Sequence, residues 1–309
     1  MSNFDIHIRL ALRYPKSITF WEAKMQNKGY FKGWYFKCCT GSKTVAFIPA
    51  YHYSKNTKTA SLQIISDDAV CNLPFKSIEY TERPLCIKLG DCVFSDKGIY
   101  LNYQNDNLSL KGSLNFGALS PISYNIMGPF ALVPFMQCRH SVYSMSHKVS
   151  GEIAVNGSLF NFKNGIGYIE GDRGRSFPKR YIWTQCCFGN NSLMLSVADI
   201  PFLGTNFTGI IGAVMLGGKE YRIATYLGYL GARAKDINKS AVTVKQGGFE
   251  LTAKLLEKKS HPLFAPIKGD MSRTIHESAS CKAYYRLLHN GDVLCEFVSD
   301  KASFEFEYP

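Results

Sequence analysis

The sequence lacks the spacings by which cysteine and histidine usually bind a metal ion. Its ten cysteines contain no C-x-x-C pair, and Cys38-Cys39 and Cys186-Cys187 are directly adjacent. Its seven histidines show no H-x-H or H-E-x-x-H spacing. We therefore expect neither a structural zinc nor a dedicated metalloenzyme site. Ten cysteines in 309 residues are also too few for a disulfide scaffold, and free thiols fit a reducing cytoplasm.

Long apolar runs are also missing. The longest, "YNIMGPFALVPFM" and "GIIGAVML", are shorter than the roughly 20 residues that span a bilayer, and proline or glycine interrupts them. The N-terminal "MSNFDIHIRLALRYPKS" is too polar for a signal peptide. We therefore predict a soluble, cytoplasmic protein.

Basic residues are abundant but not clustered. Lys and Arg number 36 against 24 Asp and Glu, a net charge of +12, yet no basic run is longer than two residues. Nucleic-acid-binding domains usually concentrate such residues on one element, so the pattern argues against nucleic acid as a partner. Peripheral contact with an anionic membrane surface and binding of an acidic small molecule remain open.

Hairpin signals dominate the rest of the chain. Alternating apolar runs flank the turn residues Asn105-Asp106-Asn107, Asn156-Gly157, Gly247-Gly248 and Asn290-Gly291. Asn-Gly is typical of a type I′ turn, and no stretch has the pattern of a long amphipathic helix. With 14% aromatic residues, these features predict an all-β protein of antiparallel strands.

The length predicts two β-domains, residues 1–145 and 146–309. Near their boundary, "LSPISYNIMGPFALVPFMQCRH" has three prolines but is too apolar for a flexible linker, so we expect it to pack against the protein. "KKSHPLFAPIKGDMSRTIHES" has the same mixture and is predicted to be irregular. Such segments either cover the mouth of a cavity or line a domain interface. "GWYFKCC" and "YIWTQCC", about half a chain apart, are weakly similar and suggest an internal duplication.

Two regions before the centre of the chain supply candidate site residues. In "GYFKGWYFK", Trp34 and Phe36 share one strand face and Tyr35 lies on the other. This is either a core strand with one wet side or the aromatic wall of a pocket, where ring faces stabilise a cation. His140 and His147 are an odd number of residues apart, so a straight strand separates them. His140 is the better site candidate, and a structural histidine is the alternative.

The central "GYIEGDRGRSFPKRYIWTQC" contains the acidic candidates. In a strand, Glu170 and Asp172 point to the same face, and like-charged carboxyls held close together raise one pKa, which makes a proton donor. The alternative is that Asp172 neutralises Arg173, Arg175 or Arg180 in a turn.

Further along this segment, Trp183 and Gln185 share a strand face, and beside a carboxyl they suit an acid that acts in dry surroundings. The segment has no G-x-S-x-G elbow, and its glycines fit neither a dinucleotide nor a P-loop template. The motif therefore favours acid chemistry over a serine nucleophile or a phosphate loop.

"NGIGYIEGDRGRSFPKRYIWTQC" resembles the signature of the tocopherol cyclase family, which reads close to "GYIEKDWGxSFPxxWIWxQCN". The resemblance continues in the expected order through "KGYFKGWYFK", "CRHSVYSMSHKVSGEI", "SLMLSVADIPFLGTNFTG", "YRIATYLG" and "LFAPIKGDMSRTIHES". It implies two lipocalin-like β-domains and no metal or redox cofactor. It also implies a reaction on a hydrophobic substrate: the alkene of a prenylated quinol is protonated, and the phenolic oxygen captures the tertiary cation to close a chroman ring. Such a site needs a desolvated acid, aromatic faces and exclusion of water.

The resemblance also implies roles for residues. Asp172 or Glu170 would donate the proton, and Gln185 and His140 would orient the phenol or relay protons. The other substrate-contacting positions would be Trp34, Phe36, Trp183, Arg173 and Glu277, the last a reserve acid.

Some positions depart from the family pattern. Arg173 and Tyr181 stand where the family usually has tryptophan, Arg139 replaces a common tyrosine, and Ser141 replaces glycine. If Arg173 or Arg139 points inward, an acidic or phosphorylated substrate is favoured. If Arg173 lies outward beside Asp172, it would depress the pKa of that carboxyl and weaken it as an acid.

Three functions follow. The first is a cytoplasmic, cofactor-free cyclase that acts on a hydrophobic, isoprenoid-bearing molecule. The second is a lipocalin-like carrier that binds such a molecule without turnover, and the third is a hydratase on the same scaffold. A carrier needs an apolar lining and an orienting hydrogen bond, whereas a cyclase also needs a carboxyl that faces the cavity.

Overall fold

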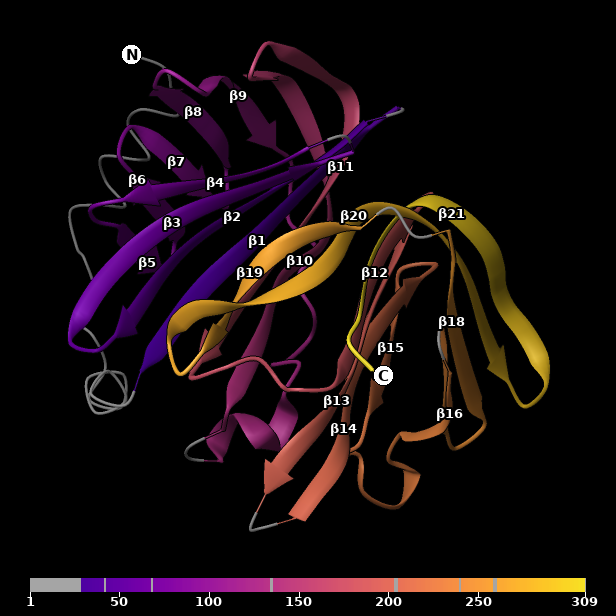
Figure 1. Cartoon of the computed structure of the whole chain (residues 1–309). Coiled ribbons are helices and arrows are strands. Elements are labelled where there is room, and N and C mark those ends of the chain that lie inside the picture. Colours follow the sequence, from indigo (N-terminus) through magenta and orange to yellow (C-terminus); the bar gives the residue numbers. More distant parts are fainter. Residues whose placement is uncertain are drawn as a thin grey trace.

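The computed structural model describes residues 29–41, 43–67, 69–133, 136–202, 205–238, 240–257 and 260–308 (Figure 1). The N-terminal segment quoted above, Pro134 and Lys258-Lys259 lie outside them. Within these ranges the chain forms antiparallel strands and two short 3-10 helices, η1 (Gly128–Leu132) and η2 (Gly228–Leu230). No helix of this part is long and apolar enough to cross a membrane. The all-β prediction is confirmed.

The first sheet has eleven strands in the spatial order β4-β3-β2-β1-β11-β10-β9-β8-β7-β6-β5. Each strand pairs with the next one along the chain, except that β4 and β5 form the two edges and β1 pairs with β11. The strands are β1 (Tyr30–Thr40), β2 (Lys43–Ser54), β3 (Thr57–Ser66), β4 (Val70–Phe75), β5 (Glu79–Glu82), β6 (Leu85–Leu89), β7 (Cys92–Ser95), β8 (Gly98–Gln104), β9 (Ser109–Phe116), β10 (Cys138–Val155) and β11 (Ser158–Gly174).

The second sheet has ten strands in the order β15-β14-β13-β12-β21-β20-β18-β17-β16, with β19 paired to β20 outside this path. The strands are β12 (Tyr181–Phe188), β13 (Asn191–Phe202), β14 (Thr205–Leu216), β15 (Lys219–Ala224), β16 (Arg233–Asn238), β17 (Ala241–Gln246), β18 (Phe249–Glu257), β19 (His261–Ile267), β20 (Asp270–His289) and β21 (Asp292–Phe306).

Both sheets are curled. In each sheet the two edge strands follow each other in the chain, and the short link between them keeps the two edges close together. β4 ends at Phe75 and β5 begins at Glu79, and the short link between them reaches about 14 Å when fully extended. In the second sheet the edges are β15 and β16, and the Ala232 amide donates to the Ala224 carbonyl at 2.9 Å. The result is two lipocalin-like, barrel-shaped sheets.

The predicted hairpin turns are present. Asn156 and Gly157, between β10 and β11, have φ angles of 49° and 82°, and Asn290 and Gly291, between β20 and β21, have 53° and 94°. Positive φ at both central positions is what a type I′ turn requires, and Asn and Gly tolerate it. The Gly247-Gly248 turn joins β17 to β18, and the Asn105 turn joins β8 to β9.

The chain changes from one sheet to the other between Gly174 and Tyr181. The expected division at residues 145 and 146 falls inside β10. The similar segments "GWYFKCC" and "YIWTQCC" lie in β1 and β12, which occupy equivalent places. Each begins a run of four strands and pairs with the last strand of its own sheet. This equivalence supports an internal duplication.

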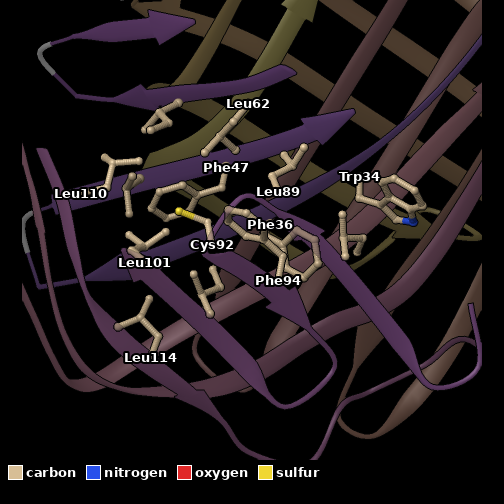
Figure 2. Close-up of a cluster of buried hydrophobic side chains, with 14 of the residues drawn as sticks. Trp34, Phe36, Phe47, Leu62, Leu89, Cys92, Phe94, Leu101, Leu110 and Leu114 are labelled. Atoms are coloured by element: carbon tan, nitrogen blue, oxygen red, sulfur yellow. The ribbon is translucent and has the colours of Figure 1, made fainter. Parts of the chain in front are cut away.

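Three apolar clusters stabilise the fold: one inside each barrel and one between the sheets. Figure 2 shows part of the first. Strand β1 contributes to two of them, because Trp34 and Phe36 face the first barrel whereas Tyr35 joins the cluster between the sheets. The predicted alternation of these side chains between the two faces of the strand is correct. Neither face is exposed to solvent there, because the second sheet covers the Tyr35 face.

The proline-containing segment before β10 packs against the protein, as expected. Ile126, Met127 and Met136 are buried in the cluster between the sheets, and the Tyr226 hydroxyl donates to the Ile126 carbonyl at 3.0 Å. This segment therefore closes one side of the space between the sheets.

The stretch predicted to be irregular is instead the hairpin of β19 and the first part of β20, here called the β19–β20 arm (residues 261–277). That prediction was wrong because Pro262 and Pro266 lie in β19, which in the described residues pairs only with β20, and such edge strands tolerate proline. The arm reaches from the second sheet to the first (Figure 1), where the Gln63 amide makes hydrogen bonds of 3.1 and 2.9 Å with the Phe264 backbone.

Candidate active site

A cavity of about 170 Å³ lies between the two sheets. Its walls come mainly from β1, β2, β10 and β11 of the first sheet, β12 to β14 of the second, and the β19–β20 arm, and most of the lining side chains are apolar. An apolar cavity of about 150 Å³ holds benzene. The cavity therefore has room for an aromatic ring or a short branched chain.

His140 lies between two carboxyl groups on the first-sheet side of this cavity. β10 and β11 place His140 directly opposite Asp172, and Glu170 precedes Asp172 by two residues on the same face of β11. His140 Nδ1 is 3.0 Å from Asp172 Oδ1, and its Nε2 is 3.1 Å from Glu170 Oε2. These three residues, here called the His140 cluster, all line the cavity.

The two carboxyls determine the charge of His140. Burial alone would lower the pKa of the imidazole, but the charges of Glu170 and Asp172, together with the hydrogen bond to Asp172, raise it well above its usual value of 6.5. The two carboxyls therefore favour the doubly protonated, charged form of His140. Of the three residues, His140 and Glu170 are buried.

Glu170 also connects the two sheets. Its Oε2 atom accepts hydrogen bonds from the Tyr168 hydroxyl and, at 3.2 Å, from the indole N–H of Trp183 in β12. Asp172 has fewer partners, His140 and the Cys138 thiol at 3.5 Å, and its side chain is 23% exposed. Of the two carboxyls, Asp172 is therefore the more accessible to a ligand.

A second pair of carboxyls lines the cavity from the second sheet. Glu277 and Glu305 are directly opposite each other on β20 and β21. The sequence makes Glu277 a candidate but does not single out Glu305. In "FEFEY", Glu305 alternates with Phe304 and Phe306, which indicates a strand with one acidic face. That signal does not show which face meets the cavity.

Aromatic rings form part of the wall of the same cavity. Tyr35 and Trp183 meet edge to face, with centroids 5.4 Å apart. Phe177 lies 5.4 Å from Phe31 and 6.0 Å from Tyr181, ring to ring. Ring faces attract a positive charge, so the walls suit a reaction with a cationic intermediate.

The cavity brings together six of the predicted site residues: Trp34, His140, Glu170, Asp172, Trp183 and Glu277. Two others lie outside it. Phe36 packs inside the first barrel, 5.7 Å from Phe94 ring to ring (Figure 2). Gln185 is fully buried, and its amide oxygen accepts a hydrogen bond from Lys37 Nζ at 3.3 Å. Strand alternation identifies the face of the sheet on which a side chain lies, but it does not show whether that side chain reaches the cavity.

Arg173, predicted to contact the substrate, does not line the cavity, and neither does Arg139. The two are directly opposite each other on β11 and β10. Each is one residue from a member of the His140 cluster, so strand alternation turns both to the other side of the sheet. Arg139 Nη2 donates to the Val133 carbonyl at 2.8 Å. These departures from the family pattern therefore leave the cavity mostly apolar.

His147 takes no part in the site. Its Nδ1 atom is 3.0 Å from Ser144 Oγ, and its ring lies 4.4 Å from that of Phe116. The predicted separation of His140 and His147 is confirmed.

The His140 cluster also has the composition of a metal site, which the histidine and cysteine spacings do not reveal. One ligand atom from each of its three residues lies within 4.8 Å of the others. However, both ring nitrogens of His140 already lie within 3.1 Å of carboxyl oxygens, so a metal ion bound to the ring would have to displace one of these contacts. The geometry fits an ion-paired acid better than a metal centre.

The fold is shared with proteins of known structure. The chain is similar to CghA in its crystal structure with Sch210972, with 9% identity and a TM-score of 0.59 over 90% of this chain and 88% of that chain. It is also similar to kievitone hydratase from Nectria haematococca, with 10% identity and a TM-score of 0.51 over 90% and 88% of the two chains. At these identities the similarity shows the fold alone. The chain matches no protein-family model and no curated protein sequence.

Proposed function

We propose that the protein is a cofactor-free enzyme that closes a chroman-type ring on a hydrophobic prenylated quinol or a related isoprenoid. The observation that carries this proposal is the His140 cluster, which places an imidazole between two carboxyls in an apolar, aromatic-lined cavity. The resemblance of the central motif to the tocopherol cyclase family supports the same chemistry.

The reaction requires one proton to be delivered and one to be released. Asp172, which receives its proton from His140, delivers it to the alkene carbon of the substrate. The resulting tertiary cation lies against the rings of Tyr35 and Trp183, which meet edge to face in the cavity wall. The phenolic oxygen attacks the cation, forms the C–O bond and releases its proton, so the product is an isomer of the substrate.

Exclusion of water decides which nucleophile reaches the cation. In a dry cavity the phenol of the same molecule is the nearest nucleophile. A water molecule admitted to the same site would attack the cation instead, and the product would be a hydrated alkene. One protein of similar fold is named for such a reaction, kievitone hydratase. A carrier would use the apolar walls but not the acid.

The substitution Asp172→Asn separates these functions. Asparagine keeps the shape of the side chain but donates no acidic proton, so turnover of a prenylated quinol should fall by about 10²- to 10⁴-fold, with ligand affinity nearly unchanged. Glu257→Gln, a change at an exposed carboxyl, is the control. Chroman and tertiary alcohol products are separated by liquid chromatography with mass spectrometry. Unchanged turnover would remove Asp172 from the mechanism, and binding without turnover by the wild type would favour the carrier.

We also propose that the protein acts in the cytoplasm, at the surface of an anionic membrane. The net charge is +12, and Leu132, Tyr229 and Leu230 on η1 and η2 are exposed. Helix η1 also contributes Phe130 to the cavity wall, so the exposed Leu132 of the same helix lies next to the site. An isoprenoid dissolved in a bilayer would reach the cavity from such a surface.

A further inference from the structure

Glu277 and Glu305 form a buried carboxyl pair that the reaction above leaves unassigned. The two residues are 2% and 8% exposed and lie directly opposite each other in the register of β20 and β21. Two ionised carboxylates buried side by side repel each other and lack hydration, so such a pair retains a proton on one of them. The pair therefore holds at least one proton.

The surroundings of the pair leave the Glu277 carboxyl short of a hydrogen-bond donor. Tyr181 donates a hydrogen bond to Glu305, whereas the Tyr35 hydroxyl is bonded to Ser303 Oγ at 3.1 Å. Glu277 Oε1 is buried and has no hydrogen-bond partner in the described part of the chain. A buried oxygen without a partner is unfavourable. Because Glu277 lines the cavity, rotation of its carboxyl toward the cavity would let a ligand hydroxyl supply the missing donor.

We propose that Glu277, with Glu305 as its proton-sharing partner, is a second proton-transfer centre that binds the substrate hydroxyl and receives its proton. This inference rests on the proposed function, in which the His140 cluster protonates the alkene. As the phenolic oxygen attacks the cation, its O–H bond breaks, the C–O bond forms and the proton moves to Glu277. After the product leaves, the pair loses this proton to water and the His140 cluster regains one.

The two centres also define the class of substrate and its orientation. The His140 cluster belongs to the first sheet and the Glu277–Glu305 pair to the second. The substrate therefore places its alkene beside the first sheet and a weakly acidic hydroxyl, such as that of a phenol, beside the second. A purely hydrocarbon isoprenoid would leave Glu277 Oε1 without a partner.

The electrostatics of the pair are consistent with this role. Burial raises the pKa of Glu277 to about 7, and burial together with the charge of Glu277 raises that of Glu305 well above its usual range. Glu170 also raises the pKa of Glu277, whereas Lys37 lowers it. Within the described residues, the titratable and charged groups that act on the pair are Tyr35 and Lys37 on β1, Glu170 and Asp172 on β11, and Tyr181 on β12, and His52 on β2 lines the same cavity. His52 stays neutral near pH 7, because burial lowers its pKa to about 4.

The test uses two probes that differ by one hydroxyl, 4-butylphenol and butylbenzene. Their dissociation constants are measured by tryptophan fluorescence on the wild type and on Glu277→Gln, below and above pH 7. Above pH 7, where the pair has lost a proton, the wild type should bind the phenol about tenfold more tightly than butylbenzene. This preference should decrease below pH 7 and be absent in Glu277→Gln. Equal affinity of the wild type for the two probes, or an undiminished preference in the variant, would overturn the proposal.

The two proposals fail separately. Probe binding needs no turnover, so Asp172→Asn should keep the preference for the phenol. A wild type that prefers the phenol but converts no prenylated quinol would contradict the cyclase function and leave the Glu277 site standing. Turnover together with equal affinity for the two probes would contradict the role of Glu277 alone. The wild-type comparison needs no variant, so it holds even if Glu277→Gln does not fold.

Discussion

Trp183 donates its indole N–H to Glu170 across the two sheets, over a distance of 3.2 Å. Trp183 belongs to β12 and Glu170 to β11, so this hydrogen bond joins the acid of one sheet to the aromatic wall of the other. Glu170 in turn contacts His140. The geometry of the site therefore depends on how the two sheets are docked, and not on either sheet alone.

The first prediction concerns this hydrogen bond. Trp183→Phe removes the indole donor and leaves a buried carboxyl with one partner fewer, which should lower the free energy of unfolding. Trp34→Phe is the matched control, because Trp34 lines the same cavity and loses the same ring volume without losing a bond to Glu170. The Trp183 variant should be less stable than the control by about 1.5–3 kcal/mol, as measured by urea unfolding. Equal stabilities would show that the hydrogen bond contributes nothing.

The second prediction concerns the charge of His140. Glu170→Gln removes one of the two charges that raise its pKa, so the pKa should fall. NMR titration of the imidazole nitrogens measures this change. His147 is an internal reference, because burial lowers its pKa to about 4 and Glu170 is not among the causes. A His140 pKa that does not change would contradict the ion-paired arrangement.

A third prediction links this charge to stability. The folded-state pKa of His140 lies above its unfolded value of about 6.5, so protonation of His140 stabilises the folded protein fully below that pH. This contribution is lost as the pH rises through the folded-state pKa. The free energy of unfolding of the wild type should therefore fall above neutral pH, and the fall should be smaller in His140→Gln. Parallel pH profiles for the two proteins would rule out the contribution.

A fourth prediction concerns the β19–β20 arm. The Gln63 side chain accepts a hydrogen bond from the Phe264 amide at 2.9 Å, so Gln63→Ala should weaken the docking of the arm by about 1 kcal/mol. Hydrogen exchange at Phe264 should then be about fivefold faster. Gln104→Ala, at an exposed position of β8, should leave that exchange unchanged. If both variants behave like the wild type, Gln63 does not hold the arm.

A fifth prediction concerns the membrane surface. If the net charge of +12 attracts the protein to anionic lipid, co-sedimentation with phosphatidylserine-containing liposomes should decrease as salt is added, because salt screens exposed charges. Neutral liposomes are the control. Binding that is absent, or that does not change with salt, would rule out the electrostatic contact.

Much of the fold follows from local signals. Asn156-Gly157 and Asn290-Gly291 specify their turns because few other pairs adopt positive φ twice in succession. The common face of Glu170 and Asp172 follows from the period of a strand, and the structure places both in the cavity.

The rest of the site depends on contacts that no local pattern encodes. Tyr35 meets Ser303, 268 residues away in the chain, and Glu277 meets Glu305 only because β20 and β21 pair in one register. Alternation also cannot distinguish Trp183, at the cavity, from Gln185, fully buried beside Lys37. Whether a side chain lines the cavity or is packed among other side chains depends on the sheet that faces it. The sequence of a single strand does not specify that sheet.

The place of the cavity, outside both barrel cores, has an evolutionary consequence. Each barrel has its own apolar interior, so a mutation in a residue that faces only the space between them would leave both interiors intact. Descendants of such a duplicated ancestor could therefore exchange one reaction for another through a few substitutions, without first acquiring a more stable scaffold.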